Sequence, residues 1–332
     1  MYRAKPYNAR PYPYPAGLMT DTAISIQNVD KRYASTHALN NVSFDIQRGE
    51  YFGLLGPNGA GKSTLISIIA GLTHATSGSV AVLGHDVRAD FRAARRALGV
   101  VPQELVYDPF FPVREMLRIQ AGYFGCGREV WPWVDELLER LDLTDKATQS
   151  MRALSGGMKR RVLIAQALVH KPDVVILDEP TAGVDVELRR TLWQFTRELN
   201  DDGHTIVLTT HYLEEAEELC DRIAILNHGS LDVLEDKRAL LDRHPYRFLS
   251  LQLSGNGGAL PAEIEALVED RHEDTLELKL EQGKHFIADV LEGIRDAGYR
   301  IQDVKTREPH LEDIFMELTS DAHHNAVSGA SA

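Results

Sequence analysis

The sequence has no long apolar run and only two cysteines. No stretch reaches the roughly 18 consecutive apolar residues that a membrane-spanning helix needs. Segment 1–17 holds no apolar core of the kind found in secretory signals, and Met19 offers an alternative start of translation. We therefore expect a soluble, cytoplasmic chain. Cys126 and Cys220 are too few for a disulfide framework, and we expect both to be buried thiols.

Positive charge is also scarce. The chain has 36 Lys and Arg against 49 Asp and Glu, a net charge of −13. Nucleic-acid-binding domains usually show a basic patch or a pI above about 9, so the charge argues against a nucleic-acid partner. The acidic excess is larger after Pro245 than before it. A solvated acidic surface is the simpler interpretation of this segment, and an acidic docking face is the alternative.

A glycine-rich loop is the most informative feature that is present. Residues 56–64 match the complete P-loop pattern, between an expected buried strand at 51–55 and an expected apolar helix at 65–70. In this context backbone N–H groups and the helix N-terminus surround the phosphates of a nucleoside triphosphate. Lys62 adds positive charge, and the Ser63 hydroxyl can bind Mg²⁺. The residues expected at the phosphates are Gly56, Pro57, Asn58, Gly59, Ala60, Gly61, Lys62, Ser63 and Thr64.

A second apolar segment ends in two carboxylates. Residues 174–177 read Val-Val-Ile-Leu, as in a parallel strand covered on both faces, and Asp178 and Glu179 follow. Ligands of open α/β sheets bind at this end of the strands. We expect Asp178 to hold Mg²⁺ through water and Glu179 to orient or deprotonate the attacking water. A surface Asp-Glu pair is the alternative interpretation, and the P-loop argues against it.

The P-loop also allows a function to be assigned to three single residues. Gln103 follows an expected strand at 98–101 and would touch Mg²⁺ or the attacking water. His211 follows another, at 206–209, and would hydrogen-bond the γ-phosphate, while Tyr33 would stack on adenine. Considered singly, a solvated loop glutamine, a structural histidine and a half-buried aromatic are the ordinary interpretations. Their assignment therefore depends on the P-loop.

Residues 154–158, Leu-Ser-Gly-Gly-Met, precede a long helical pattern. Ser155 suits the N-cap of this helix, and Gly156 and Gly157 expose backbone N–H groups at its positive end. The sequence therefore predicts a second anion site, far along the chain from the P-loop.

These motifs resemble the ATP-binding subunits of ABC transporters, over about residues 22–240. Met158 departs from the commonest family form, which has Gln, but this variant is familiar in ABC-2-type exporters. Segments 154–161 and 178–185 resemble the drug, polysaccharide and nodulation-factor exporter branch. The family's order of motifs is present as Tyr33, Walker A 56–64, Gln103, signature 154–158, Walker B 174–179, D-loop 182–185 and His211.

The resemblance implies a Mg²⁺-dependent ATPase that works with a second copy of itself. It implies that Ser155, Gly156, Gly157 and Asp185 serve the nucleotide of that copy, so that two chains sandwich two ATP molecules head to tail. It also implies separate ABC-2-type permease subunits, which would hold the chain at the cytoplasmic face of the inner membrane. The transported substrate binds the membrane chains in this family, so this sequence does not reveal it.

A soluble ABC ATPase acting on nucleic acid or ribosomes is the alternative function. That class predicts a coiled-coil insertion, tandem ATPase domains or a basic linker, and the sequence contains none of these. Export direction rests on analogy. We therefore expect a transport ATPase.

The expected fold is α/β: a P-loop NTPase (RecA-like) core with antiparallel β and helical subdomains, plus a small C-terminal α+β accessory domain. The accessory domain would contain strands at 247–253, 275–280 and 300–305 and a helix at 286–297. The expected boundaries are a disordered extension at 1–19, an ATPase domain at 20–242 with its helical subdomain at about 104–160, the accessory domain at 243–319 and a disordered tail at 320–332.

Two apolar segments remain outside the nucleotide motifs. At 308–318 an amphipathic helix would place Leu311, Ile314, Phe315 and Leu318 on one face, for packing on its own sheet or for a dimer contact. Residues 104–113 combine two prolines with Val106, Tyr107, Phe110 and Phe111. This segment is either packed locally under the helical subdomain or forms the lip of a groove for a permease helix.

Overall fold

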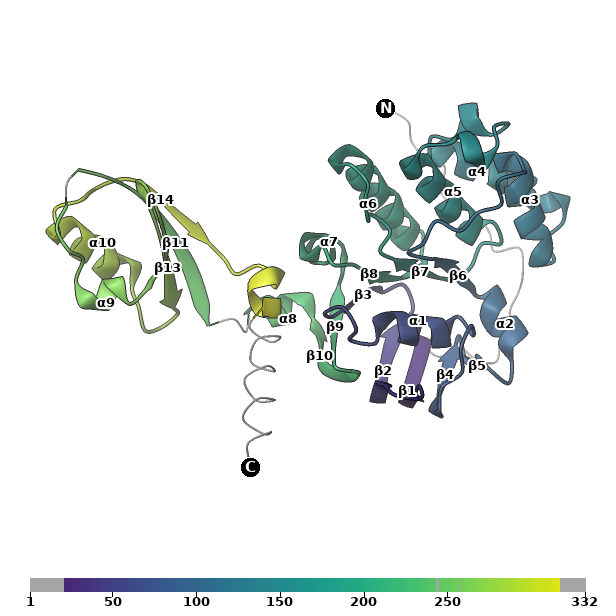
Figure 1. The fold of residues 1–332 in the computed structure, drawn as a ribbon, viewed down its shortest axis with the longest axis horizontal. Coiled ribbons are helices and arrows are strands. Elements are labelled where there is room, and N and C mark those ends of the chain that lie inside the picture. Colours follow the sequence, from purple (N-terminus) through teal and green to yellow (C-terminus); the bar gives the residue numbers. More distant parts are fainter. Residues whose placement is uncertain (1–20, 243–244, 256, 317–332) are drawn as a thin grey trace. The chain divides into compact units, whose positions relative to one another are not determined.

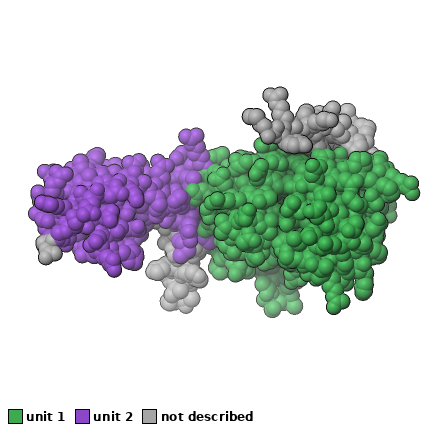
Figure 2. Space-filling view, turned by 90° about the horizontal axis from the view of Figure 1, so that it is seen from above, with its two compact units in different colours: residues 1–237 green, residues 238–332 purple. Residues whose placement is uncertain are grey.

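The computed structural model describes residues 21–242, 245–255 and 257–316. The chain divides into two compact units, which meet in the sequence at Lys237 and Arg238 (Figure 2). No helix in the described ranges has the length and apolar content needed to cross a bilayer. The extension at 1–19 and the tail at 320–332 lie outside the described residues.

The first unit begins with an antiparallel sheet of order β2-β1-β4-β5. Its register places Ile24 opposite Ile46 and Ile26 opposite Phe44, so alternate residues of both strands enter the core and confirm the expected antiparallel pattern. The strands are β1 (Thr22–Arg32), β2 (His37–Gln47), β4 (Ser77–Val82) and β5 (His85–Asp86).

A six-stranded sheet of order β10-β9-β3-β8-β7-β6 forms the centre of this unit (Figure 1). The strands from β9 to β6 are parallel, and β10 joins β9 as an antiparallel hairpin. Every residue of β3 and β8 is buried, as expected for parallel strands covered on both faces. The strands are β3 (Tyr51–Leu55), β6 (Leu98–Val101), β7 (Val174–Asp178), β8 (Thr205–Thr209), β9 (Arg222–Asn227) and β10 (Ser230–Asp236).

Helices cover both faces of the parallel sheet. In Figure 1, α1 (Lys62–Ile69) lies between this sheet and the antiparallel one, and its side chains share one core with both. On the other side lie α6 (Val186–Asp201) and α7 (Leu213–Leu219). This arrangement confirms the expected α/β core. Segments 56–61, 102–103, 179 and 210–211 all follow parallel strands, so they meet at the carboxyl edge of the sheet.

A group of helices separates β6 from β7 in the sequence. Trp133 ties this group together, since its indole N–H donates to the Leu168 carbonyl at 2.8 Å. Cys126, in the loop after α3, is only partly buried, so the expectation that both thiols are buried is right for Cys220 alone. The helices are α3 (Val113–Tyr123), α4 (Trp131–Arg140) and α5 (Gly156–Leu168), with short 3-10 turns at Arg128–Val130, Thr144–Lys146 and Met151–Ala153. A further helix, α2 (Phe91–Arg96), lies directly before β6.

The second unit contains a four-stranded antiparallel sheet of order β12-β13-β11-β14. Its chain order is βαββαβ, a split βαβ arrangement. Leu249, Leu251 and Leu278 pack with Ile264 and Ile294 of the two helices. The elements are β11 (Tyr246–Ser254), α9 (Ala262–Glu265), β12 (Val268–His272), β13 (Thr275–Glu281), α10 (Ile287–Asp296) and β14 (Arg300–Arg307), with α8 (Lys237–Asp242) before them.

The expected strands and helix of this unit are present, but β12 and α9 were not predicted from the sequence. The reason is composition, because β12 is an exposed edge strand with four polar residues in a row. Residues 311–316 are helical, with Leu311 and Ile314 buried, whereas Leu318 lies outside the described residues.

Candidate functional site

The glycines of the P-loop are required by its backbone. Gly56 has φ 148° and Gly61 has φ 104°, values that L side chains rarely adopt. A Cβ at Gly56 would lie 2.2 Å from the Leu226 carbonyl oxygen, and one at Gly61 would lie 2.6 Å from the Ala38 carbonyl oxygen. The loop is therefore packed against β2 and the end of β9 by backbone alone.

Lys62 opens helix α1 and lies across the loop. Its ammonium donates to the carbonyls of Gly56 at 2.6 Å and Pro57 at 3.1 Å. Burial lowers the pKa of Lys62, while Glu179 and Asp178 act in the opposite direction. No side chain caps α1, so its first N–H groups are not satisfied by a capping residue. Cation and free N–H groups together suit the phosphates of a nucleotide.

The two carboxylates at the end of β7 have different surroundings. Thr209 donates its hydroxyl to Asp178 Oδ1 at 2.5 Å, which orients that carboxylate from the neighbouring strand β8. Glu179 is largely buried, and its side chain contacts His211 Nδ1. Its backbone is left-handed, with φ 52°, and its N–H donates to the Thr209 carbonyl at 3.0 Å. The two strands thus fix both carboxylates.

One cavity of about 540 Å³ joins most of the expected site residues. Tyr33, Gln103, Asp178 and Glu179 line it together with residues 58–64 of the P-loop. Tyr33 is 49% exposed and lies on one wall, with the Lys31 ammonium 4.7 Å from its ring centroid. The cavity therefore offers a phosphate end and an aromatic wall.

The cavity also has the ligands that Mg²⁺ prefers. Ser63, Gln103 and Asp178, which each carry a side-chain oxygen, line it from three different segments of the chain. No cluster of three His, Cys, Asp or Glu residues that could hold a metal by themselves occurs in the described ranges. Mg²⁺ commonly takes one or two carboxylates and completes its shell with water and phosphate oxygens, so this sparse donor set fits it.

The signature residues lie outside this cavity. Ser155 caps α5, and its hydroxyl accepts from the Met158 N–H at 3.3 Å, which confirms the expected N-cap. Gly156 faces open space, whereas a Cβ at Gly157 would lie 2.5 Å from the Leu188 side chain of α6. Asp185 caps α6 by accepting from the Leu188 N–H at 2.8 Å. The structure brings these residues to helix ends, not to the P-loop of the same chain.

Sequence reasoning missed several residues around the cavity. Thr36, His37 and His228 line it, and His37 Nε2 lies 2.6 Å from Asp30 Oδ1. That hydrogen bond lowers the pKa of Asp30. Buried Arg160 of α5 donates to the carbonyls of Pro102 at 2.7 Å and Gln103 at 2.8 Å. Arg160 could have been found from the sequence, because it lies two positions after the signature motif. Nothing local in the sequence indicated the other residues.

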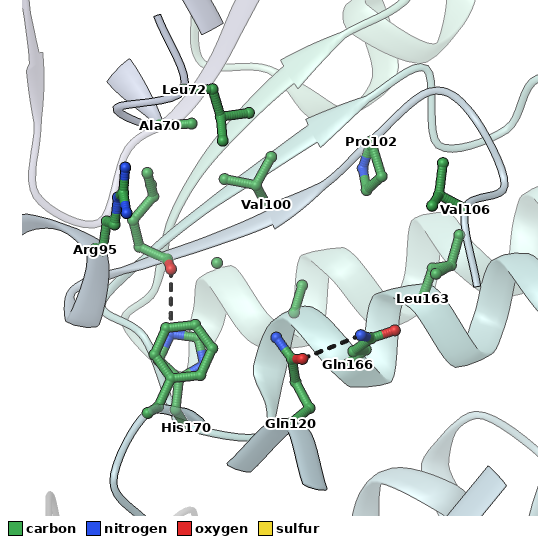
Figure 3. Close-up of a pocket in the computed structure, with 14 residues that line it drawn as sticks. Ala70, Leu72, Arg95, Val100, Pro102, Val106, Gln120, Leu163, Gln166 and His170 are labelled. Atoms are coloured by element: carbon green, nitrogen blue, oxygen red, sulfur yellow. Dashed lines mark hydrogen bonds between the residues drawn. The ribbon is translucent and has the colours of Figure 1, made fainter. Parts of the chain in front are cut away.

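A second cavity, of about 330 Å³, lies between β6 and the helices α3 and α5 (Figure 3). Its lining is mostly apolar and includes Val100, Pro102, Val106 and Leu163. His170 closes one end, where it hydrogen-bonds to the Leu98 carbonyl at 3.1 Å and stacks on Phe124. Burial lowers the pKa of His170 to about 4, so its ring is neutral at pH 7.

Comparison with known proteins agrees with this geometry. The ABC transporter family matches residues 39–182. The Nod factor export ATP-binding protein I of Rhizobium etli is 39% identical over 307 residues, which cover 90% of this chain and 93% of that protein. The linearmycin resistance ATP-binding protein LnrL of Bacillus subtilis is 35% identical, covering 89% of this chain and 98% of that protein.

Solved structures resemble about two-thirds of the chain. The ATP-binding subunit of an ABC transporter superposes with a TM-score of 0.63 at 29% identity, covering 67% of this chain and 93% of that one. A dimeric ATP-binding cassette in a post-hydrolysis state, bound to ADP and Pi, gives 0.60 at 29% identity, covering 65% and 99%. From its motifs, its fold and these likenesses, the chain belongs to the ABC transporter family, as one of its ATP-binding, ATP-hydrolysing proteins.

Proposed function

We propose that this chain powers an ABC-2-type membrane exporter by ATP-driven dimerisation of its nucleotide-binding domains. The observation that carries the proposal is the cavity in which the P-loop, Gln103, Asp178 and Glu179 meet. Relatives named for Nod factor export and linearmycin resistance support an export role. The alternative, an ATPase acting on nucleic acid or ribosomes, gains no support from them or from the net charge of −13.

In this proposal each residue of the cavity has one task. The P-loop N–H groups and Lys62 bind the β- and γ-phosphates, and Tyr33 stacks on adenine. Ser63, Gln103 and Asp178 hold Mg²⁺, which neutralises phosphate charge when bound. Glu179 orients or deprotonates the attacking water. His211 does not itself line the cavity, but it contacts Glu179 and would hydrogen-bond the γ-phosphate from there.

The signature residues serve a second copy of the chain. The N-terminus of α5, with Ser155 as its N-cap and Gly156 and Gly157 in its first turn, is a positive helix end outside its own chain's cavity, so it suits a phosphate presented by a partner. Asp185, at the N-cap of α6, would approach the same partner site. A C₂ dimer satisfies both nucleotides at once, and solved cassettes of this fold are dimeric.

The second cavity and the segment beside it suit a cytoplasmic helix of a permease. Phe110 is 85% exposed and Val106 is 69% exposed, and Phe111 is also exposed. This exposure disagrees with local packing of Phe110 and Phe111 under the helices. Pro102 and Val106 line this cavity, and they lie one and three positions from Gln103 in the sequence, so a helix seated there would sense the γ-phosphate. Binding to the permease would place the chain at the cytoplasmic face of the inner membrane.

The Glu179→Gln variant tests the catalytic part of this function. ATP binding should remain, turnover should fall by about 100-fold or more because the water loses its base, and an ATP-bound dimer should accumulate. Steady-state ATPase assays and light scattering after size-exclusion chromatography measure the two effects. Glu139→Gln, an exposed glutamate on α4, is the matched control and should behave as the unaltered protein. Near-normal turnover of Glu179→Gln would contradict the assignment.

A further inference from the structure

Outside the nucleotide cavity, helix α7 carries a buried carboxylate that the proposed chemistry does not use. Glu215 is 1% exposed, and it does not line the cavity. A carboxylate at this depth is costly unless several donors satisfy it, so its partners indicate its role.

Three donors from three parts of the chain converge on this side chain. The Thr181 hydroxyl donates to Oε2 at 3.0 Å, and the Trp193 indole N–H donates to Oε1 at 2.8 Å. The Thr210 side chain forms a third hydrogen bond with the carboxylate. Thr181 and Thr210 are themselves almost fully buried. Burial raises the pKa of Glu215, and these hydrogen bonds, with nearby Arg189, oppose that rise.

Each donor belongs to an element that carries a residue of the nucleotide site. Thr181 follows Glu179 by two positions, and Thr210 directly precedes His211. Thr210 also accepts from the Tyr212 N–H at 3.0 Å, so both flanks of His211 are fixed. Trp193 lies two turns into α6, the helix that Asp185 caps. One carboxylate therefore joins the Glu179 loop, the His211 loop and α6.

We propose that Glu215 is a positioning residue that locks these three elements together and so couples hydrolysis in its own cavity to the start of α6. The coupling half of this inference rests on the proposed function, in which Asp185 at that start approaches the partner's nucleotide. The positioning half depends only on the contacts within one chain.

The chemistry of the site makes the Gln variant informative. A carboxylate accepts on both oxygens, whereas an amide has one accepting oxygen and an NH₂ group that only donates. Glu215→Gln therefore keeps the size of the side chain but has one accepting oxygen fewer. If that oxygen faces the donor-only Trp193 N–H, the NH₂ group faces Thr181, whose hydroxyl must turn to accept and then loses the acceptor for its own proton. A buried donor without a partner shifts its element or stays unsatisfied.

We expect Glu215→Gln to lower kcat for ATP by about 10- to 100-fold, because small displacements of catalytic groups cost that much. The dissociation constant for ATP, measured by equilibrium binding to the full chain, should not change. Glu214→Gln, the exposed neighbour on the same helix, is the matched control and should leave both values unchanged. An unchanged kcat in Glu215→Gln would overturn the proposal, and so would an equal loss in the control.

Two milder variants decide the matter if Glu215→Gln does not fold. Thr181→Val and Trp193→Phe each remove one donor and should lower kcat while ATP affinity is kept. Where Glu215→Gln does fold, combining it with Thr181→Val should give a loss smaller than the product of the single losses, because both act on one contact. Full kcat in both single variants, or strictly multiplicative losses, would overturn the inference. Dimerisation of the Glu179→Gln chain is measured separately, so a failure of the two-copy sandwich is distinguished from the outcome at Glu215.

Discussion

Several single residues of the nucleotide site have a left-handed backbone. For glycines this conformation has no steric cost, whereas for other residues it does. Gly56, Gly59 and Gly61 adopt positive φ at no steric cost, because they lack a Cβ. Glu179 also has positive φ, and for a non-glycine residue such a conformation costs about 1–3 kcal/mol. The Glu179 N–H bond to Thr209 and the contact with His211 hold it there. Two non-glycine residues that line the cavity, Glu179 and His228, thus have positive φ, and one of them is the residue assigned to the attacking water.

Gly61→Ala tests the constraint in the phosphate loop. The new Cβ would lie 2.6 Å from the Ala38 carbonyl oxygen, so the loop must move and ATP affinity should fall by at least about tenfold, the equivalent of about 1.4 kcal/mol. Gly84→Ala is the matched control, since Gly84 also has positive φ but meets nothing within 4 Å. Both variants should lose some stability in thermal unfolding because of their positive φ, Gly61→Ala more than Gly84→Ala because of its clash, and only Gly61→Ala should lose nucleotide binding. Equal ATP affinity in the two variants would contradict this account.

At the scale of elements, the segment after β6 connects the nucleotide to the second cavity. Gln103 and Val106 are separated by two residues, and they line the first and second cavity respectively. Arg160 of α5 holds the carbonyls of Pro102 and Gln103. A displacement of Gln103 is therefore passed both to α5, which begins at the signature, and to the exposed aromatic lip.

The double variant Tyr107→Ala with Phe110→Ala tests this lip. We expect permease co-purification and transport to fall by about tenfold or more, as for the loss of an aromatic anchor, while the isolated chain still folds and hydrolyses ATP. Tyr123→Ala, an exposed aromatic on α3 that does not line the cavity, is the control. If the double variant still binds its permease and supports transport, the lip is not the docking site.

The elements also show how far the sequence could predict this protein. Strands β3, β7 and β8 were predictable to within a residue, because buried parallel strands read as unbroken apolar runs. Strand β12 was not, since an exposed edge strand has no apolar alternation. The P-loop and both carboxylates were predictable from local motifs. His37 and Glu215 were not, because their partners lie in other segments of the chain that only the fold brings together.

At the scale of the whole molecule, the parallel sheet gathers its site at one edge, yet the signature stays outside the cavity of the same chain. In the proposed dimer one chain would therefore supply two half-sites, and two copies would be needed to complete either nucleotide site.

Mixing two inactive variants tests this division. Lys62→Ala removes the phosphate cation, and Ser155→Arg blocks the signature, so each variant alone should lose at least about 100-fold in ATPase activity. In a mixed dimer one site combines the intact P-loop of one chain with the intact signature of the other. Mixing should therefore restore activity, with at most one working site per mixed dimer. A higher concentration of either variant alone should not restore activity. Normal hydrolysis by Ser155→Arg alone would exclude the sandwich.

The turn between β9 and β10 connects the phosphate loop to strand β2. The Gly229 N–H donates to the Ala60 carbonyl at 3.1 Å, and the Gly229 carbonyl accepts from the Asn40 N–H at 2.8 Å. One residue thus fastens the phosphate loop to β2, whose first residues border the base side of the cavity. Strand β10 starts at the next residue and runs into α8 and the second unit. Because β10 pairs with β9 from Ser230 to Asp236, this hairpin fixes the position of its own turn, and a change in the length of the turn would displace Ala60 and the phosphate loop with it.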